Sequence, residues 1–319
     1  MSASLQQVHV DAALSQISVD FSNRMGYVAE QVAPLVPVQK QSDFYYVMGK
    51  QKLRRFDTTV SPGSDFQRID LEWDKKGYFF ENGHGLEFAI PDQLRANADP
   101  GAQLDVQATK TLTENILIDQ EYLLAQGPLA SGNLTANGIT NTTLSGTNQW
   151  SDYFNSDPIT VIDLAKTTVL NQVAVVPNAA VVNDKLFFTL RNHPRIIDRV
   201  KYTGSGVRSP LSQDELRQAL GLDYLFVATA RYQTAHEGQA DALGPIWGNH
   251  FYLFYRPANP GLMEPAFMYT LLWVGQGFGQ LMSRYREQWR VQDVLQLQKY
   301  YLQQIISPGS AYVFISATS

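Results

Sequence analysis

The feature that most constrains the fold is a polar segment, residues 146–165, that turns abruptly into an amphipathic helix. Asp157 is a good N-cap because its carboxylate can accept hydrogen bonds from the first free N–H groups of a helix. Pro158 suits the first helical position, where no N–H is needed. The apolar residues of one face then follow at helical spacing: Ile159, Ile162, Ala165 and Val169. The sequence therefore predicts a helix that begins at Pro158.

The composition favours a subunit that other chains enclose. The 319 residues are 44% hydrophobic and 12% aromatic but only 17% charged, whereas soluble domains usually carry about 25% charged residues. The length indicates about two domains or one elaborated fold. So small a charged fraction leaves much apolar and neutral polar surface, which neighbouring subunits can cover.

The net charge and the absence of cysteine exclude several classes of function. A net charge of -5 and a pI near 5.5 argue against a reader of nucleic acid, since such proteins usually carry a basic stripe. Any contact with DNA should be weak and without sequence preference. Without cysteine, no disulfide, thiol nucleophile or thiolate ligand is available. Residues 1–23 lack a signal-peptide pattern and no apolar run suits a transmembrane helix, so neither secretion nor membrane insertion is expected.

The N-terminal part of the chain predicts an arm and a long hairpin. In residues 1–42, Pro34 and Pro37 enforce an extended path and remove backbone donors, which suits an arm that lies along another surface. Residues 44–47 and 68–73 have the aromatic and branched side chains of paired strands. Such a long hairpin buries little against its own domain, so it needs a partner.

Charged side chains gather on both halves of this hairpin. The residues that could mark a subunit interface are Lys50, Lys52, Arg54 and Arg55 on the outgoing half, and Asp70 and Glu72 on the returning half. One interpretation is a solvated hairpin edge. The other is complementary charge on neighbouring copies, which would set the register of the contact more than its strength.

The rest of the chain mixes helices and strands without a regular repeat, which indicates an α+β fold. Residues 77–80 and 86–90 predict a second short hairpin. Residues 100–126 predict the longest helix, closed by Gly127-Pro128. Its apolar face would follow Leu104, Ala108, Leu112, Asn115 or Ile116, and Asp119 or Leu123. A capping box at residues 212–215 predicts another helix start.

Residues 249–255 predict a strand at the centre of the core. Phe251, Leu253 and Tyr255 should share one face, and Tyr252 and Phe254 the other, because side chains alternate along a strand. Dense apolar content on both faces indicates a central strand and not an edge strand.

No set of residues predicts catalysis or metal binding. The nucleophile elbow, the phosphate loop and the paired-histidine zinc motif do not occur. His84 and His193 occupy ordinary loop positions, and His236-Glu237 lacks the second histidine of a zinc motif. The glycines of residues 275–279 miss the spacing of a dinucleotide-binding loop and predict a turn or bulge. We therefore expect no catalytic residue, no cofactor and no metal.

The order of these segments resembles the major capsid proteins of tailed bacteriophages. The segments that carry the resemblance, which covers nearly the whole chain, are the loop from Trp150 to Pro158, residues 175–183, 220–227 and 247–252, and the terminal apolar strand at 311–315. The resemblance implies the HK97-like shell fold, with a long spine helix. Its parts would be an N-terminal arm (1–42), an extended hairpin loop (43–95), a peripheral domain (96–182 plus 281–319) and an axial domain (183–280).

The same resemblance implies a structural function. Many copies would form the pentamers and hexamers of an icosahedral shell around double-stranded DNA, located in the virion and assembled in the host cytoplasm. A separate scaffolding protein, a portal and decoration proteins would be further partners, and contact with packaged DNA would be non-specific. The alternatives are an encapsulin-like nanocompartment shell around a cargo enzyme, a tail or portal-associated protein, and an enzyme without a recognisable catalytic set.

Overall fold

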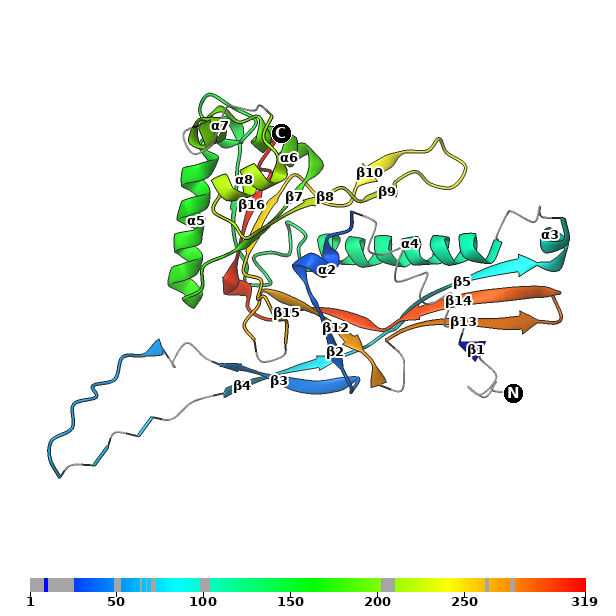
Figure 1. The fold of residues 1–319 in the computed structure, drawn as a ribbon, viewed down its shortest axis with the longest axis horizontal. Helices are drawn as coiled ribbons and strands as arrows, with labels where there is room; N and C mark the ends of the chain where they lie inside the picture. The colour runs from blue at the N-terminus through cyan, green and yellow to red at the C-terminus, as the bar shows by residue number, and fades with distance from the viewer. Residues whose placement is uncertain are drawn as a thin grey trace.

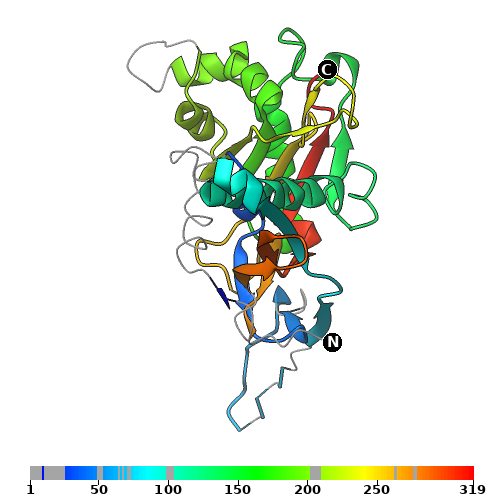
Figure 2. The same cartoon turned by 90° about the vertical axis from the view of Figure 1, so that its right-hand side faces the viewer.

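The computed structural model describes residues 9–10, 26–48, 53–63, 65–66, 68–69, 73–97, 104–201, 210–261, 264–275 and 279–319. This part of the protein is elongated: a helix-covered sheet lies at one side, a long helix lies above an antiparallel sheet at the other, and a thin hairpin projects below (Figure 1). Figure 2 looks along the long helix and places the helix-covered sheet above it and the hairpin below. The predicted α+β class is confirmed.

The helix-covered sheet has five strands in the order β6-β16-β11-β7-β8. Their bounds are β6 Thr140–Thr143, β16 Ala311–Ile315, β11 Phe251–Phe254, β7 Ala179–Asn183 and β8 Tyr224–Ala228. β11 lies at the centre, antiparallel to both β16 and β7. Phe251 and Leu253 pack on the helix-covered face, and Tyr252 and Phe254 pack on the other. The prediction of a central strand with two apolar faces is confirmed.

The same sheet crosses the domain boundary expected at residue 182. β6 and β16 come from the segments 96–182 and 281–319, whereas β8 and β11 come from 183–280. β7 runs across the boundary itself. One hydrogen-bonded layer therefore contains strands from both segments that the resemblance divides between a peripheral and an axial domain.

Four helices pack on one face of this sheet: α5 Pro158–Val173, α6 Asp184–Arg191, α7 Pro194–Lys201 and α8 Gln213–Ala219. As predicted, the Asp157 carboxylate caps α5 and accepts a hydrogen bond from the N–H of Thr160. The predicted capping box also forms, since Ser212 and Glu215 each accept from the other's backbone N–H at the start of α8. Short 3-10 turns, η3 Gly146–Asn148 and η5 Pro308–Ser310, complete this region.

The long helix α4, Leu104–Gln126, lies on an antiparallel sheet of order β1-β13-β14-β5, and the predicted first turn, residues 100–103, falls outside the described residues. The strands are β1 His9–Val10, β13 Gln280–Glu287, β14 Gln292–Lys299 and β5 His84–Pro91, and the short helix α3 Asp92–Asn97 follows β5. Ala108, Leu112 and Ile116 of α4 pack on this sheet, as predicted.

Beyond Ile116 the predicted apolar face of α4 is wrong. Asp119 and Leu123 are exposed, whereas Gln120 and Leu124 are buried. The buried face shifts because the C-terminal end of α4 leaves the sheet and packs between the N-terminal segment and the five-stranded sheet. This second environment could not be read from the helical period alone.

The projecting hairpin consists of β3 Ser42–Met48 and β4 Trp73–Phe79, paired from Ser42 with Phe79 to Met48 with Trp73. Of the returning strand expected at residues 68–73, residues 68–69 lie outside any strand, Trp73 begins β4, and residues 70–72 lie outside the described residues. The second hairpin, residues 77–80 with 86–90, is wrong, because β4 pairs with β3 and β5 pairs with β14.

The base of the hairpin is anchored on a small sheet of order β15-β12-β2. Its strands are β15 Tyr301–Ile305, β12 Met268–Trp273 and β2 Leu35–Val38. Tyr45, Tyr78 and Phe80 are buried there against Val36 and Leu271. The hairpin is thus fixed at its root and extends from a rigid support.

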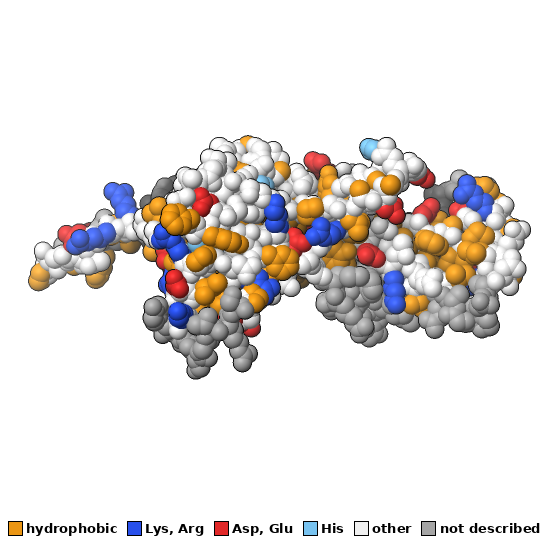
Figure 3. Space-filling view, turned by 90° about the horizontal axis from the view of Figure 1, so that it is seen from above, with side chains coloured by type: hydrophobic (Ala, Val, Ile, Leu, Met, Phe, Trp, Pro, Cys, Tyr) orange, Lys and Arg blue, Asp and Glu red, His pale blue; other side chains and the backbone are white. Residues whose placement is uncertain are grey.

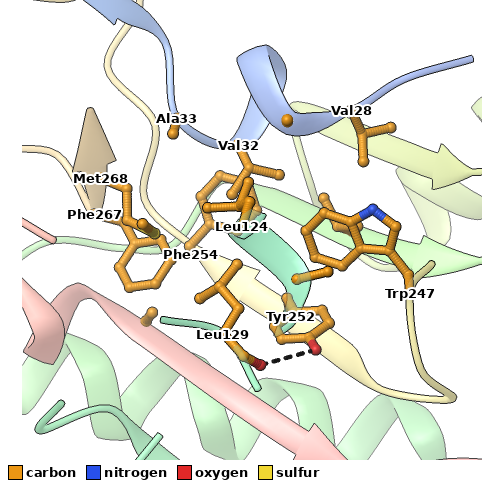
Figure 4. Packing of buried hydrophobic residues seen from close by; sticks show 14 of the residues in the cluster. Val28, Val32, Ala33, Leu124, Leu129, Trp247, Tyr252, Phe254, Phe267 and Met268 are labelled. Atoms are coloured by element: carbon orange, nitrogen blue, oxygen red, sulfur yellow. Dashed lines mark hydrogen bonds between the residues drawn. The ribbon is translucent and has the colours of Figure 1, made fainter. Parts of the chain in front are cut away.

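The largest buried cluster joins the short helix α2 Ala29–Val32, the end of α4 and the second face of the five-stranded sheet. Figure 4 shows Trp247, Tyr252 and Phe254 packed with Leu124 and Val32 at this junction. Nearby, the small hairpin of β9 Arg231–Gln233 and β10 Leu243–Pro245 extends over α4 (Figure 1). The N-terminal segment is therefore part of the core from Val28 onward.

Candidate assembly surfaces

The hairpin beyond β3 and β4 presents its side chains to solvent. Figure 1 shows this tip reaching away from the rest of the chain. Of its described residues, 53–63, 65–66 and 68–69, all but Phe56 are exposed, and none belongs to a strand. Phe66 is 82% exposed, and Leu53 and Ile69 are also largely exposed. Apolar side chains gathered on one exposed element are typical of a binding surface.

Two of the six candidate interface residues lie on this tip. Arg54 and Arg55 are exposed, and no ion pair joins either guanidinium to another residue in the described ranges. The other four, Lys50, Lys52, Asp70 and Glu72, lie outside the described residues. The placed arginines are therefore available for an acidic partner.

Basic residues also cluster at residues 284–290, where Arg284 and Arg286 have an internal role. Arg284 and Arg286 on β13 contact the Asp293 carboxylate on β14 at 2.6 and 3.2 Å, and Arg286 also contacts Asp92 at 2.5 Å. Hydrogen bonds from Arg284 hold the pKa of Asp293 below its usual value. Arg95 joins the same network at 3.4 Å from Asp293. These ion pairs connect β13 and β14 to α3.

A buried carboxylate joins the N-terminal segment to the long helix. Glu121 on α4 is fully buried, and it accepts hydrogen bonds from the backbone N–H groups of Val28 at 3.0 Å and Ala29 at 2.8 Å. The indole N–H of Trp247 donates to the same carboxylate at 2.6 Å. Burial raises the pKa of Glu121, and the N–H bonds oppose that change. One side chain thereby links the arm, α4 and the loop before β11.

A second buried polar group lies beside Glu121. The Lys299 ammonium donates to the Glu30 carboxylate at 2.9 Å and to the side-chain amide oxygen of Gln120, Oε1, at 2.8 Å. Sequence reasoning missed both Lys299 and Glu121. The helical period gave no signal for Glu121, because it predicted a buried face through Asp119 or Leu123 and not through Gln120 and Glu121.

Two histidines expected in ordinary loops have specific partners instead. His193 is fully buried, and its Nε2 lies 3.0 Å from the Ser156 hydroxyl, so the loop before α5 is tied to the start of α7. Burial lowers the pKa of His193. His84 begins β5, stacks on Tyr301 with ring centroids 4.3 Å apart, and contacts Asp119 at 3.4 Å. Both side chains serve packing.

The described residues contain no group of three or more His, Asp or Glu side chains that could hold a metal ion. Within the same part of the chain, no helix combines the length and apolar character needed to cross a membrane.

Figure 3 shows the upper surface, where apolar patches are separated by small numbers of charged groups.

No protein-family model matches the sequence. The chain is 26% identical over 267 residues to the major capsid protein of Burkholderia phage BcepMu, which covers 82% of this chain and 83% of that one. It is 30% identical over 255 residues to the major capsid protein of Pseudomonas phage JBD67, which covers 77% of both chains. A phage-related protein from Bordetella bronchiseptica RB50 has a solved structure with a TM-score of 0.74 and 24% identity, covering 97% of this chain and 98% of that chain.

The solved phage capsids and this chain share the HK97-like shell fold, so the class predicted from the sequence is confirmed. The fold extends to the SrpI encapsulin complex from Synechococcus elongatus PCC 7942, with a TM-score of 0.51, 9% identity and coverage of 91% of this chain and 87% of that chain. The chain belongs to the family of phage major capsid proteins.

Proposed function

We propose that this chain is the shell subunit of a tailed bacteriophage and self-assembles into an icosahedral capsid around a double-stranded DNA genome. The observation that carries the proposal is the sequence likeness to two phage major capsid proteins over most of each chain. The exposed tip supports it, because an element that presents Phe66 and Leu53 to solvent gains stability when a neighbour covers it. The proposed role is structural and involves no catalytic turnover.

The shell would be built from pentamers and hexamers. We propose a virion location after assembly in the host cytoplasm, with a separate scaffolding protein, a portal and decoration proteins as further partners. The net charge of -5 supports only weak, non-specific contact with packaged DNA.

The expected division into an arm (1–42), an extended loop (43–95), a peripheral domain and an axial domain stays part of this proposal. The sheet order supports one change to it. β6, β7 and β16 would be counted with the axial domain, because they share its hydrogen-bonded layer with β8 and β11. The peripheral domain would then consist of α4 and the sheet beneath it.

The hairpin tip would dock on a neighbouring copy through charge as well as apolar contact. Arg54 and Arg55 supply the placed part of this surface, and Lys50, Lys52, Asp70 and Glu72 would complete it. Complementary charge on the neighbour would set register. The double variant Arg54→Glu/Arg55→Glu should therefore leave the subunit folded but impair assembly.

The test compares particle yield by light scattering and electron microscopy, and the fold of the unassembled subunit by circular dichroism. The matched control, Arg54→Lys/Arg55→Lys, keeps both charges and should assemble nearly as well as the wild type. Unchanged yield and particle stability in the glutamate variant would refute the role of the arginines. A wild-type chain that stays monomeric at every salt and protein concentration would refute the shell function.

The alternative is a nanocompartment shell that encloses a cargo enzyme, since an encapsulin shares the fold. The identity to phage proteins favours the capsid. The content of particles purified from the native source separates the two: nucleic acid supports a capsid, and a protein cargo supports a nanocompartment.

A further inference from the structure

The turn at residues 152–156, just before α5, is held closed by hydrogen bonds within it. The Asp152 carboxylate accepts from the backbone N–H groups of Phe154 at 3.1 Å and Asn155 at 3.2 Å. The backbone carbonyl oxygen of Asp152 accepts from the N–H of Ser156 at 3.1 Å and from its hydroxyl at 2.7 Å. The closed turn presents Phe154, which is 88% exposed, to solvent.

A buried histidine supports this turn from the start of α7. His193 is fully buried, and its Nε2 lies 3.0 Å from the hydroxyl oxygen of Ser156. Because the hydroxyl proton is directed to the carbonyl oxygen of Asp152, the hydroxyl oxygen can only accept from His193. The neutral imidazole therefore carries its proton on Nε2, and Nδ1 has none.

The Nδ1 side of His193 offers no acceptor for a second proton. This nitrogen is buried and has no hydrogen-bond partner among the described residues. The Tyr153 ring lies edge-on to the imidazole, with ring centroids 5.5 Å apart. Protonation would create a buried cation with an unpaired N–H, which is strongly unfavourable. The closed turn is therefore compatible with the neutral imidazole alone.

The charged groups around His193 do not compensate for this penalty. Burial is the main cause that lowers the pKa of His193, and the Arg195 guanidinium of α7 lowers it further. The Asp157 carboxylate acts in the opposite direction, but it is paired with Arg195 at 3.0 Å. Arg191 at the end of α6 lies over aromatic rings of its own helix. The imidazole thus stays neutral while the turn is closed.

The two aspartates of this region keep their charge in mild acid. Hydrogen bonds from Asn155 hold the pKa of Asp152 below its ordinary 3.8. Burial acts to raise the pKa of Asp157, but hydrogen bonds from Thr160 outweigh it, so the net change is also downward. An exposed histidine, in contrast, titrates near 6.5. His193 is therefore the group here that changes its charge in mild acid once it meets water.

We propose that His193 and Ser156 form an acid-sensitive latch, which holds the turn of residues 152–156 closed at neutral pH and releases it in mild acid. When the turn opens, water can solvate both ring nitrogens and the imidazole takes up a proton. The residues that carry Phe154 are then freed, so the surface beside α5 changes with pH. This inference goes beyond the shell function and does not depend on it, because every contact involved lies within one subunit.

The test measures amide hydrogen exchange of the full chain by mass spectrometry at about pH 7.5 and about pH 5.5, with His193→Gln as the reference variant. The glutamine amide can donate to Ser156 but does not titrate. Dividing the wild-type exchange rate by the rate of the variant at the same pH cancels the intrinsic pH dependence of exchange. For residues 152–157 this ratio should rise about tenfold in acid, because only the open turn binds the proton. A constant ratio would overturn the inference.

Two controls separate the latch from a general loosening in acid. His236→Gln removes an exposed histidine between β9 and β10, and its exchange should match the wild type at both pH values. Peptides of α4 should show a constant ratio, and a rise equal to that of residues 152–157 would overturn the inference.

A second measurement needs no variant, so it applies even when His193→Gln does not fold. Hydrogen exchange at the imidazole C2 position of the wild-type chain reports the pKa of each histidine. The pKa of His193 should lie below 6.5. A pKa of 6.5 or above, with the amides of residues 152–157 still protected in acid, would show that the closed turn accepts the proton and would refute the latch.

Discussion

Removal of the Leu253 side chain tests how firmly the centre of the five-stranded sheet is packed. Leu253 is fully buried in β11, between β7 and β16, and its side chain packs against the helices on that face. Leu253→Ala removes three carbon atoms, worth about 2.4 kcal/mol at about 0.8 kcal/mol per buried CH2 group. The cavity adds to this loss, since strands on both sides limit collapse, so we expect about 3 to 5 kcal/mol in total.

The assay is urea unfolding of the dilute, unassembled subunit, followed by circular dichroism. Leu243→Ala is the matched control: Leu243 is 69% exposed on β10, and its truncation should change the free energy of unfolding by about 0.5 kcal/mol or less. A Leu253→Ala loss below about 1 kcal/mol would refute the argument, because a site that collapses so freely is not a rigid core position.

Three further predictions concern single carboxylates. Burial raises the pKa of Glu121 above its ordinary 4.5, so its contribution to stability is complete below pH 4.5 and is lost as the pH rises through the raised pKa. Glu121→Gln should therefore flatten the profile of the free energy of unfolding above pH 4.5, and parallel profiles would contradict this. Asp157→Ala removes the cap of α5 and should cost about 1 kcal/mol in urea unfolding, where a wild-type midpoint would count against it. The arginines lower the pKa of Asp293, so the stabilisation it provides is present above its ordinary pKa of 3.8 and is lost in acid. Asp293→Asn should thus destabilise the subunit at neutral pH and match the wild type in strong acid, as thermal unfolding across pH would reveal.

The elements predicted well are those whose signals lie within one segment. The cap and proline of residues 157–158 are local groups, and they define the start of α5. The alternation of Phe251 to Phe254 likewise places a two-sided strand without reference to the rest of the chain. In both cases the signal that identifies the element lies within a few neighbouring residues, although β11 pairs with the distant strands β7 and β16.

The predictions that failed concern residues whose contacts lie far away in the sequence. Residues 77–80 and 86–90 have the composition of a hairpin, but β5 pairs with β14, about two hundred residues later, which no local pattern indicates. Glu121 could not be assigned a role, because the N–H groups that it accepts from lie 93 and 126 residues away. The length and composition of the hairpin predict that its tip contacts another subunit. The residues that make this contact remain a prediction.

The position of β16 within the five-stranded sheet constrains when the chain can fold. β16 separates β6 from β11, and contacts such as that between Thr142 and Tyr312 span 170 residues. During translation β6 emerges long before β16, its neighbour among the described strands, so this layer cannot close until residue 315 has left the ribosome. Such non-local pairing is also slow, because the loop-closure entropy is lost before the contacts form. A nascent chain therefore lacks the finished sheet, and the fold itself delays the appearance of an assembly-competent subunit until synthesis of that strand is complete.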